Sequence, residues 1–310
     1  MRPTLTVVID TEEEFDWAAP FDPRATSVAN IACQGLAQRM FDRFGVVPTY
    51  VVDYPVACSA AARAVLRPMA DSGRCEIGAH LHPWVNPPIG STTDPRRSFP
   101  GNLPPEVERA KLAALTQAIA DGFGRRPVLY KAGRYGIGPA TYGILAALGY
   151  RADLSVVPYT DFTAAGGPDF SRRSPQPAIG AEGILALPLT AGFAGRLAGL
   201  GHHLHPLLRG PLAGAAARLG LLERLRLSPE GHRLDDMKRL TRALLAGGQK
   251  LFMLTYHSSS LLPGGSPYAR NAAERDALLA AVDGYLSFFL GECGGRAETV
   301  GAVAATLLGG

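Results

Sequence analysis

The sequence is poor in charge and lacks a long apolar run. Charged residues make up 19% of the 310 positions, and Lys plus Arg (31) exceed Asp plus Glu (27) by only four. Such a weak excess, without a basic patch, argues against nucleic acid as a partner. No apolar stretch reaches the roughly 18–20 residues of a membrane span, and no signal-peptide core precedes the first apolar run. We therefore expect a soluble, cytoplasmic protein, and the sequence leaves its oligomeric state open.

Cysteine is also scarce, and the four cysteines stand far apart. Cys33, Cys58, Cys75 and Cys293 form no C-x-x-C pair. Neither a zinc knuckle nor a dithiol redox motif is expected from this spacing. Free, buried thiols are favoured over disulfides in a chain of this length.

Strand and helix patterns alternate through the first half of the chain. Short apolar runs predict strands at 5–10, 46–52, 75–80, 127–131 and 150–155, and a later one at 250–256. Helical spacing of apolar residues predicts helices at 27–44, 60–72, 104–122 and 139–148. Repeated strand–helix–strand units indicate an α/β fold with a parallel sheet. In such folds, functional side chains gather at the carboxyl ends of the strands.

The remaining segments fit one catalytic domain covering 1–310. Residues 86–101 and 158–183 are rich in Pro, Gly, Ser and Thr, which predicts long loops of the kind that often bind ligands. A helical insertion is expected at about 195–245. It contains the sequence GHHLHP at 201–206, which lies outside the strand-end pattern. We therefore do not predict a metal site at His202, His203 and His205.

Carboxylates crowd the end of the first predicted strand. Five of them fall within seven positions: Asp10, Glu12, Glu13, Glu14 and Asp16. A surface acidic run is the usual interpretation, but this one leaves an apolar strand, where burial and mutual repulsion raise pKa values unless a cation neutralises the charge. We predict function for the first two, and a solvated face or a helix cap for the last three.

Two histidines end the third predicted strand. His80 and His82 stand two apart, so an extended chain places both imidazoles on one side, within reach of one ion. Two imidazoles and a carboxylate leave coordination positions open, as a hydrolytic metal site requires. A single buried histidine is usually structural, and an H-x-H pair alone is a weak signal. The pair beside Trp84 favours metal ligands.

Two further polar residues follow strands. His257 precedes the polar run at 258–260, where a histidine can act as a general acid; a core histidine is the alternative. Arg134 stands among glycines after the fourth predicted strand. It either orients a catalytic carboxylate or binds substrate, and an ordinary salt bridge explains it almost as well.

The order of these motifs resembles the polysaccharide deacetylase family, also called the NodB-homology or carbohydrate esterase 4-like family. The stretches DTEEEFDW, HLHPW and YHSS are similar to a divergent, WalW-like branch. The resemblance runs from about residue 5 to residue 261. It implies a distorted, TIM-like (β/α) barrel of about seven parallel strands. It also implies a divalent metal, commonly zinc, held by one carboxylate and two histidines.

The acidic and histidine motifs depart from the typical family pattern. Typical members carry adjacent aspartates after the first strand, and the second position here is Thr11. Branches with a D-x-D/E spacing match better, and they imply Asp10 as the base and Glu12 as the ligand. Typical histidines stand four apart, but position 84 is a tryptophan, so His82 completes the set with His80.

The other two motifs match more simply. The family's RxPY motif corresponds to Arg134, Tyr135 and Gly136, without the proline, and its LxxH motif is matched by 254–257 without alteration. The resemblance implies that His257 protonates the departing amine. It also implies that Arg134 holds the catalytic aspartate in its ionised form.

Together these features predict a metal-dependent hydrolase that removes N-acetyl groups from a carbohydrate or glycoconjugate. The predicted catalytic residues are Asp10, His257 and Arg134, the metal ligands are Glu12, His80 and His82, and the substrate-binding aromatics are Trp17, Trp84 and Tyr135. Two alternatives remain open: a hydrolase of non-sugar amides on the same barrel, and a catalytically decayed glycan-binding protein. A cleft lined by aromatic side chains favours a glycan, and metal analysis separates an enzyme from a decayed site.

Overall fold

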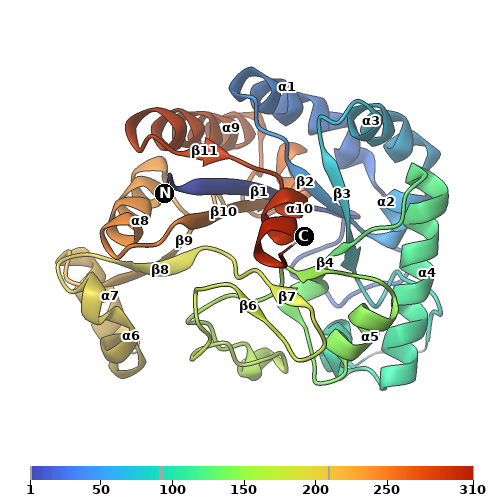
Figure 1. The fold of residues 1–310 in the computed structure, drawn as a ribbon, viewed down its shortest axis with the longest axis horizontal. Helices are drawn as coiled ribbons and strands as arrows, with labels where there is room; N and C mark the ends of the chain where they lie inside the picture. Colours follow the sequence, from blue (N-terminus) through green and yellow to red (C-terminus); the bar gives the residue numbers. More distant parts are fainter. Residues whose placement is uncertain (1, 91–93, 209, 310) are drawn as a thin grey trace.

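A curved, mostly parallel sheet forms the centre of the computed structural model, which describes residues 2–90, 94–208 and 210–309, and helices cover its outer face (Figure 1). Seven strands are parallel neighbours, in the order β10 (Leu251–His257), β1 (Thr4–Thr11), β2 (Thr49–Val52), β3 (Glu76–Leu81), β4 (Leu129–Ala132), β5 (Ala152–Asp153) and β7 (Leu185–Ala186). The antiparallel β6 (Ala178–Ile179) joins β7, and β11 (Arg296–Ala297) pairs with the start of β1. The predicted distorted barrel of about seven parallel strands is confirmed.

The curve does not close through a continuous strand ladder. Between β7 and β10 lies a separate hairpin of β8 (Ala191–Ala194) and β9 (Glu223–Arg226). Isolated hydrogen bonds join this hairpin region to β10: the Thr255 N–H donates to the Leu227 carbonyl at 3.2 Å, and the Met253 N–H donates to the Thr190 hydroxyl at 2.7 Å. The barrel is therefore open on this side.

The four helices predicted in the first half of the chain are present as α1 (Gln34–Phe44), α3 (Ala60–Asp71), α4 (Pro105–Phe123) and α5 (Thr141–Ala147). The helices α8 (Leu234–Ala246), α9 (Ala272–Ser287) and α10 (Val300–Leu307) lie in the second half. The helix predicted at 27–44 is split into a 3-10 turn, η1 (Ala29–Cys33), and α1. Gly45 ends α1 in a left-handed conformation with φ of 63°, as expected of a C-terminal cap. The sequence did not predict α2 (Tyr54–Cys58), whose first turn is capped by the Asp53 carboxylate.

Short helical turns occupy several of the loops. They are η2 (Pro95–Ser98), η3 (Pro100–Asn102), η4 (Gly133–Tyr135), η5 (Thr163–Ala165), η6 (Ala198–Leu200), η7 (His205–Leu207), η8 (Ser258–Leu261) and the π-turn η9 (Phe288–Glu292). The predicted loops at 86–101 and 158–183 thus contain turns and the short β6, and residues 91–93 of the first lie outside the described residues. In the described parts of these two loops there is no long helix.

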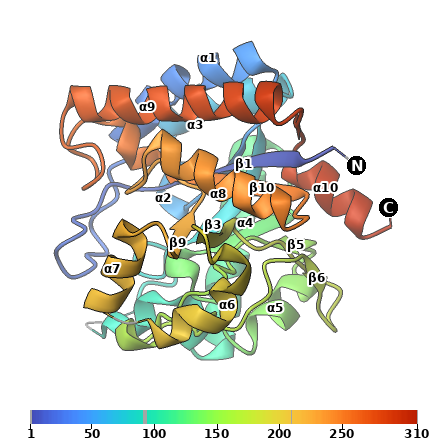
Figure 2. The ribbon, with the colours of Figure 1, turned by 90° about the vertical axis from the view of Figure 1, so that its left-hand side faces the viewer.

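The segment expected as an insertion at about 195–245 contains several elements. The short α6 (Gly201–Leu204) and α7 (Pro211–Arg218) lie beyond the edge of the sheet, with β9 behind them (Figures 1 and 2). Helix α8 instead lies beside α9 in the outer layer. No helix in the described ranges is long and apolar enough to cross a membrane. The described cysteines are free, as predicted, but only Cys75 is buried and Cys58 is exposed.

Alternation along the strands divides the core in two. Residues such as Val7 and Ile9 of β1 face outward and pack under the helices, whereas Val8 faces the inside of the curve. Val300 and Ala304 of α10 belong to this inner cluster. Helix α10 therefore helps to fill the apolar interior, and the polar side chains lie at the carboxyl ends of the strands.

Candidate active site

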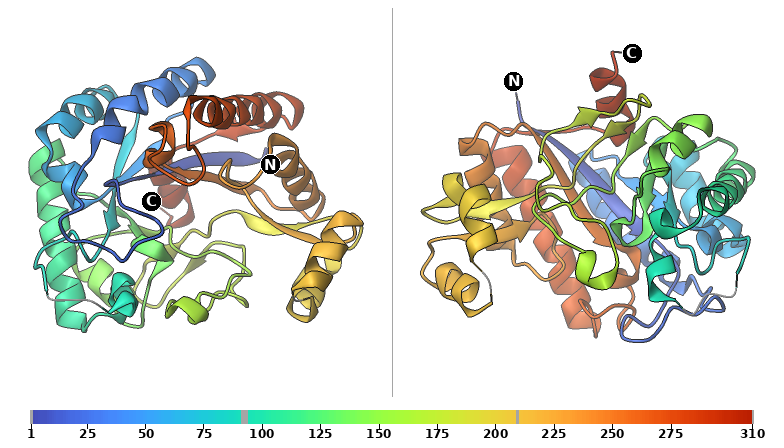
Figure 3. Two further views of the ribbon diagram at one scale, coloured as in Figure 1. Left: turned by 180° about the vertical axis from the view of Figure 1, so that it is seen from behind. Right: turned by 90° about the horizontal axis from the view of Figure 1, so that it is seen from below.

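The inner face of the sheet brings four polar side chains together at the carboxyl ends of the strands. Asp10 lies opposite His257 in the register of β1 and β10, and His80 lies opposite Lys131 in the register of β3 and β4. Period two fixes this arrangement. Asp10, Lys131 and His257 have the same parity as inner apolar residues of their own strands, and His80 alternates with the outward-facing Ala79 and Leu81. The loops after β1 (blue) and β10 (orange) lie side by side over this region (Figures 2 and 3).

Glu12, His80 and His82 form a compact set of potential metal ligands. Glu12 Oε2 lies 3.5 Å from His80 Nε2 and 3.4 Å from His82 Nε2. Ligand atoms arranged tetrahedrally at zinc-like bond lengths stand about 3.4 Å apart, so the spacing fits an ion at their centre. Glu12 Oε1 is buried without a hydrogen-bond partner among the described residues, as expected of an oxygen that serves a cation.

The protonation states of these residues also suit a cation. Burial lowers the pKa of His80 well below its usual range, and burial likewise lowers the pKa of His82 to about 4, against the opposing effect of nearby carboxylates. Both imidazoles are therefore neutral at neutral pH, which is the form that binds metal. Burial, reinforced by Glu13 and Asp10, raises the pKa of Glu12 well above normal. A bound divalent ion would lower the pKa of Glu12 again, because its positive charge stabilises the carboxylate.

Hydrogen bonds fix which nitrogen of each histidine faces the ligand set. His80 Nδ1 lies 2.9 Å from the Lys131 carbonyl oxygen, so it carries the proton and donates it. His82 Nδ1 lies 2.8 Å from Glu13 Oε2, a carboxylate that also accepts a hydrogen bond from Trp84 Nε1 at 2.7 Å. Both Nε2 atoms are thereby left free to act as acceptors or ligands.

The fully buried Glu13 corrects one prediction. Its side chain is not part of a solvated face, because the loop after β1 turns it between His82 and Asp53, whose carboxylate accepts the Glu13 N–H at 2.6 Å. Glu14 does act as a cap: it accepts the Asn30 N–H at 2.6 Å, at the start of η1. Asp16 is exposed, as predicted.

Asp10 is paired with Lys131 instead of Arg134, which corrects a second prediction. Lys131 Nζ lies 2.6 Å from both oxygens of the Asp10 carboxylate, and both side chains are buried. Burial alone would raise the pKa of Asp10, but the charge and hydrogen bonds of Lys131, together with the electrostatic effect of the neighbouring histidines, outweigh burial and lower the pKa to about 2. Asp10 is therefore ionised at neutral pH and can accept a proton.

The guanidinium of Arg134 is directed elsewhere. Arg134 stands in a left-handed conformation with φ of 53°, donates a 2.5 Å hydrogen bond to Ser98 Oγ, and lies 4.0 Å from the centre of the Phe99 ring. The left-handed backbone after β4 turns the side chain out of the strand alternation and into the loop that follows β3. It lines the same cavity as Asp10 without pairing with it.

His257 lies between two carboxylates. Its Nε2 is 3.5 Å from Asp10 Oδ2, and its Nδ1 donates to Glu230 Oε2 at 2.7 Å. Burial would lower the pKa of His257, but Glu230 and Asp10 together raise it above the usual value. Glu230 also accepts the His257 backbone N–H at 2.9 Å and the Ser260 hydroxyl at 2.5 Å, so its position is well fixed.

No protein-family model and no curated protein matches the sequence. Solved structures do match, over nearly the whole chain. A protein from Mycobacterium smegmatis described as a polysaccharide deacetylase has a TM-score of 0.60 at 17% identity, covering 98% of this chain and 89% of its own. The chain has the polysaccharide deacetylase fold. The chain is also similar to PuuE allantoinase, with a TM-score of 0.55 at 15% identity, covering 97% of this chain and 88% of that one. It is similar as well to a GH57-type branching enzyme from Pyrococcus horikoshii, with a TM-score of 0.54 at 13% identity, covering 99% of this chain and 71% of that one.

At these identities the likeness establishes the polysaccharide deacetylase fold and leaves the reaction to be argued from the site. The WalW-like branch stays a prediction. The fold explains why strands far apart in the sequence contribute to one cluster, since the parallel strands β1, β3, β4 and β10 all end at one rim. Glu230 and Glu13 lie outside the strands and complete the cluster from the loops.

An aromatic cavity of about 310 Å³ covers the cluster on this deacetylase fold. All three aromatic residues predicted to bind substrate line it: Trp17, Trp84 and Tyr135. The Trp17 ring meets the His257 ring edge-on at 5.0 Å, and Trp84 stacks on His82 at 4.2 Å. The other lining residues are Asp10, Glu12, Phe15, Phe21, His80, His82, Phe99, Ala132, Arg134, Phe162, Ala165, Arg226, His257 and Tyr268.

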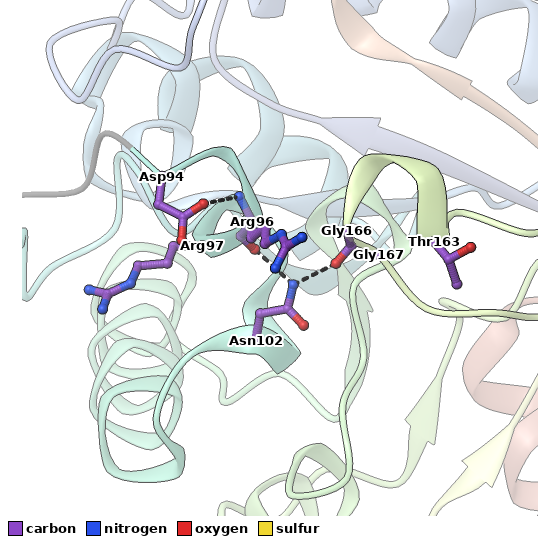
Figure 4. Close-up of a pocket in the computed structure, with 7 residues that line it drawn as sticks. All are labelled: Asp94, Arg96, Arg97, Asn102, Thr163, Gly166 and Gly167. Carbon is purple, nitrogen blue, oxygen red and sulfur yellow. Dashed lines mark hydrogen bonds between the residues drawn. The ribbon is translucent and has the colours of Figure 1, made fainter.

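Two other hollows lie on the deacetylase fold. A cavity of about 1280 Å³ adjoins the aromatic one and shares Trp17, Phe21, Trp84 and Arg134 with it. A hollow of about 460 Å³ lies apart from the cluster, between η2 and η5 (Figure 4). There Asn102 Nδ2 donates to the Arg96 carbonyl at 2.9 Å and to the Gly166 carbonyl at 2.7 Å, which ties two loops together.

Proposed function

We propose that this protein is a metal-dependent hydrolase that removes an N-acetyl group from a carbohydrate or glycoconjugate. The observation that carries the proposal is the juxtaposition of a Glu12, His80 and His82 ligand set with a separate Asp10–Lys131 pair and with His257. A metal-dependent hydrolase that cleaves an amide needs a site for the ion, a base and an acid, and this cluster offers residues for all three in one cavity.

The ligand set suits a divalent ion, and zinc is the metal that we expect. Glu12, His80 and His82 would hold it, since their donor atoms lie within 4.8 Å of one another and both histidines are neutral, as a metal requires. The positive charge of the ion would favour the ionised form of Glu12. When bound there, such an ion supplies Lewis acidity toward the acetyl carbonyl and toward water.

The protein's own residues move the protons. Asp10, held ionised by Lys131, accepts a proton from the attacking water. His257 carries a proton because Glu230 and Asp10 raise its pKa, and it donates that proton to the nitrogen of the departing amine. The edge-on Trp17 ring packs beside His257 and limits its access to bulk water.

The walls of the cavity support a sugar substrate. Aromatic side chains such as Trp17 and Tyr135 offer apolar surface against which a sugar ring packs, with polar groups at one end of the cavity. The Trp84 ring contributes to the wall while it stacks between His82 and Phe21. The adjoining cavity of about 1280 Å³ offers room for the rest of a larger glycoconjugate. The likeness to an allantoinase, whose name denotes a substrate other than a sugar, supports a non-sugar amide as the second candidate.

Metal analysis combined with acetate release tests the proposal. Purified protein and the His80→Ala and His82→Ala variants are analysed for bound metal, with the exposed His202→Ala as the matched control. We expect about one divalent ion per chain in the parent and the control, and strong loss in both site variants. Acetate release from N-acetylglucosamine and its oligomers should follow the metal content. A full complement of metal in both site variants contradicts the proposed ligand set.

A further inference from the structure

Two guanidinium groups line the aromatic cavity without a carboxylate partner. Arg134 and Arg226 both face the space that also contains Asp10, Glu12 and His257. The ion pairs of this cavity join Asp10 to Lys131 and to His257, and neither guanidinium pairs with a carboxylate of the described residues. Two like charges at one cavity repel each other, so their juxtaposition indicates a function beyond packing.

Arg134 is held rigidly in place. Its guanidinium lies 4.0 Å from the centre of the Phe99 ring and 5.1 Å from that of Phe21, and Ser98 accepts one of its five N–H groups. Burial lowers its pKa, and no neighbouring charge opposes that effect. The remaining N–H donors are available to a ligand in the cavity.

Arg226 reaches the cavity from β9. Its Nη1 donates to the Tyr135 hydroxyl at 3.3 Å, and the Tyr135 ring stacks on Phe162 at 5.4 Å. Glu230 is the carboxylate that most influences Arg226. Both oxygens of Glu230, however, accept hydrogen bonds from His257 and Ser260, and this carboxylate forms no ion pair with Arg226 among the described residues.

The loops that carry these supports are tied to one another. Phe99 and Ser98 belong to the loop that contains η2, and Phe162 precedes η5. Asn102 joins the two loops through its hydrogen bonds to the Arg96 and Gly166 carbonyls (Figure 4). The positions of the two guanidinium groups are therefore preorganised, which lowers the entropic cost of binding a ligand.

We propose that Arg134 and Arg226 bind a carboxylate or phosphate group of the substrate, so that the acetylated molecule is an anion. Guanidinium groups offer forked N–H donors that match the geometry of these oxyanions, whereas sugar hydroxyls leave the charge uncompensated. In a cavity of about 310 Å³ the anionic group lies on the same small molecule or terminal residue as the scissile amide. The identity of the cleaved bond rests on the proposed function, but the anion site does not.

Binding of amide-free hexoses tests the anion site without turnover. Glucose 6-phosphate, glucuronate and glucose are titrated into the metal-loaded protein by calorimetry. We expect at least one of the two anions to bind more tightly than glucose, and Arg134→Gln and Arg226→Gln each to weaken that binding by about 10–100-fold, as for loss of a charge-assisted hydrogen bond. Preference for the phosphate or for the carboxylate then assigns the group.

The controls separate a lost contact from a lost fold. Arg151→Gln changes the net charge equally at an exposed position before β5 and should bind like the parent. Arg226→Lys keeps the charge and should recover part of the affinity, and circular dichroism checks the fold of each variant. The proposal is overturned if the parent binds the anions no more tightly than glucose. It is also overturned if both glutamine variants bind the anion as tightly as the parent, and that result would assign the anion to the metal.

Kinetics distinguish failure of this inference from failure of the proposed reaction. N-acetylglucosamine 6-phosphate, N-acetylmuramic acid and N-acetylglucosamine are compared by acetate release. We expect the ratio of kcat/KM for the preferred anion to that for the neutral sugar to fall about 10–100-fold in Arg134→Gln and Arg226→Gln. If the parent cleaves the neutral sugar best, and neither variant changes the ratio of kcat/KM between anion and neutral sugar, the anion site alone is overturned. Absence of cleavage, with arginine-dependent anion binding, overturns the reaction alone.

Discussion

Lys131 Nζ lies 2.6 Å from both oxygens of the Asp10 carboxylate, inside the barrel and away from solvent. The resemblance to the deacetylase family implied that Arg134 would hold this aspartate, but the structure pairs the aspartate with Lys131 of β4, whereas Arg134 lies in the turn that follows this strand. The lysine reaches the carboxylate across the interior, whereas the arginine after it points to the loops. Lys131 therefore pairs with the base, Asp10, and Arg134 places a second cation in the cavity wall.

Lys131→Met should shift the acid limb of the pH–rate profile to higher pH. The base must be ionised, and the pKa of Asp10 is held at about 2 only because Lys131 and its neighbours outweigh burial. Without the ammonium group the pKa rises, so turnover is lost at a higher pH as the solution is acidified. The measurement is kcat/KM from pH 4 to 9, a range in which the ionisation of Asp10 gives the parent no acid limb and should give the variant one. Identical acid behaviour of the parent and the variant in this range would show that Asp10 is not the base.

The same pair predicts a coupling in stability. Removing one partner of a buried ion pair costs about 3–5 kcal/mol, because the other charge is left uncompensated. Lys131→Met should therefore be strongly destabilised, and adding Asp10→Asn should restore much of the loss. Urea unfolding of the two single variants and the double variant at pH 7 measures the coupling. Additive losses would contradict the pairing seen here.

Glu230→Gln should move the alkaline limb in the opposite direction. Burial lowers the pKa of His257, and Glu230 and Asp10 raise it above its usual value. A general acid must be protonated, so activity falls as pH rises through that pKa. Loss of the Glu230 charge lowers the pKa, and the fall should begin at a lower pH with about 10–100-fold lower kcat at pH 8. Glu223→Gln, on the partly exposed β9, is the matched control.

The strand pattern contains a signal for one more residue of this site, Lys131. Because side chains alternate, the predicted strand at 127–131 places position 131 on the same side as Leu129, which lines the interior. A lysine facing a barrel interior is unusual, since a charged group is seldom buried without a partner. That mismatch, together with an acidic cluster elsewhere, was the available signal for a buried ion pair.

Other residues of the site had no such signal. Glu230 lies in a loop between β9 and α8, and its contact with His257 depends on where that loop returns to the sheet. Period two places Glu13 on the face opposite to Glu12, and that face was expected to be solvated. The Glu13 side chain instead bonds to His82 and Trp84, and the Asp53 carboxylate at the start of α2 accepts the Glu13 backbone N–H. Neither the loop path nor α2 could be predicted from local patterns.

Glu13→Gln should weaken metal binding while leaving the ligands themselves intact. Glu13 accepts the Nδ1 proton of His82 and so orients Nε2 of that ring toward Glu12 and His80. Loss of a carboxylate that orients a ligating histidine typically costs about 10–100-fold in metal affinity. Competition with a chelating indicator measures that affinity. Trp84→Phe removes the hydrogen bond that Trp84 donates to Glu13 and should weaken metal binding less. If Trp84→Phe weakened metal binding more than Glu13→Gln, Trp84 and not Glu13 would be the residue that positions the ligands.

A buried carboxyl far from the metal ligands gives a separate test of the structure. Glu108 of α4 is 1% exposed, and its Oε1 accepts a hydrogen bond from the Thr141 hydroxyl at 2.6 Å. Burial raises its pKa, and the hydrogen bond from Thr141 offsets only part of that rise, which leaves the pKa at about 7. A carboxyl that is harder to ionise in the folded protein favours folding only while it is protonated.

Glu108→Gln should therefore become more stable relative to the parent as pH rises from 5 to 8. The stabilisation from the protonated carboxyl is fully present below the unfolded pKa of 4.5 and is lost as pH rises through about 7. Glutamine stays neutral and can still accept the Thr141 hydroxyl, so its stability escapes that loss, which amounts to at most about 3 kcal/mol. Urea unfolding of both proteins at pH 5 and pH 8 gives the difference directly, and other titrating groups cancel. Glu106→Gln, exposed two residues earlier, is the control and should show no such change. A constant difference between Glu108→Gln and the parent would mean that this carboxyl reaches water in solution.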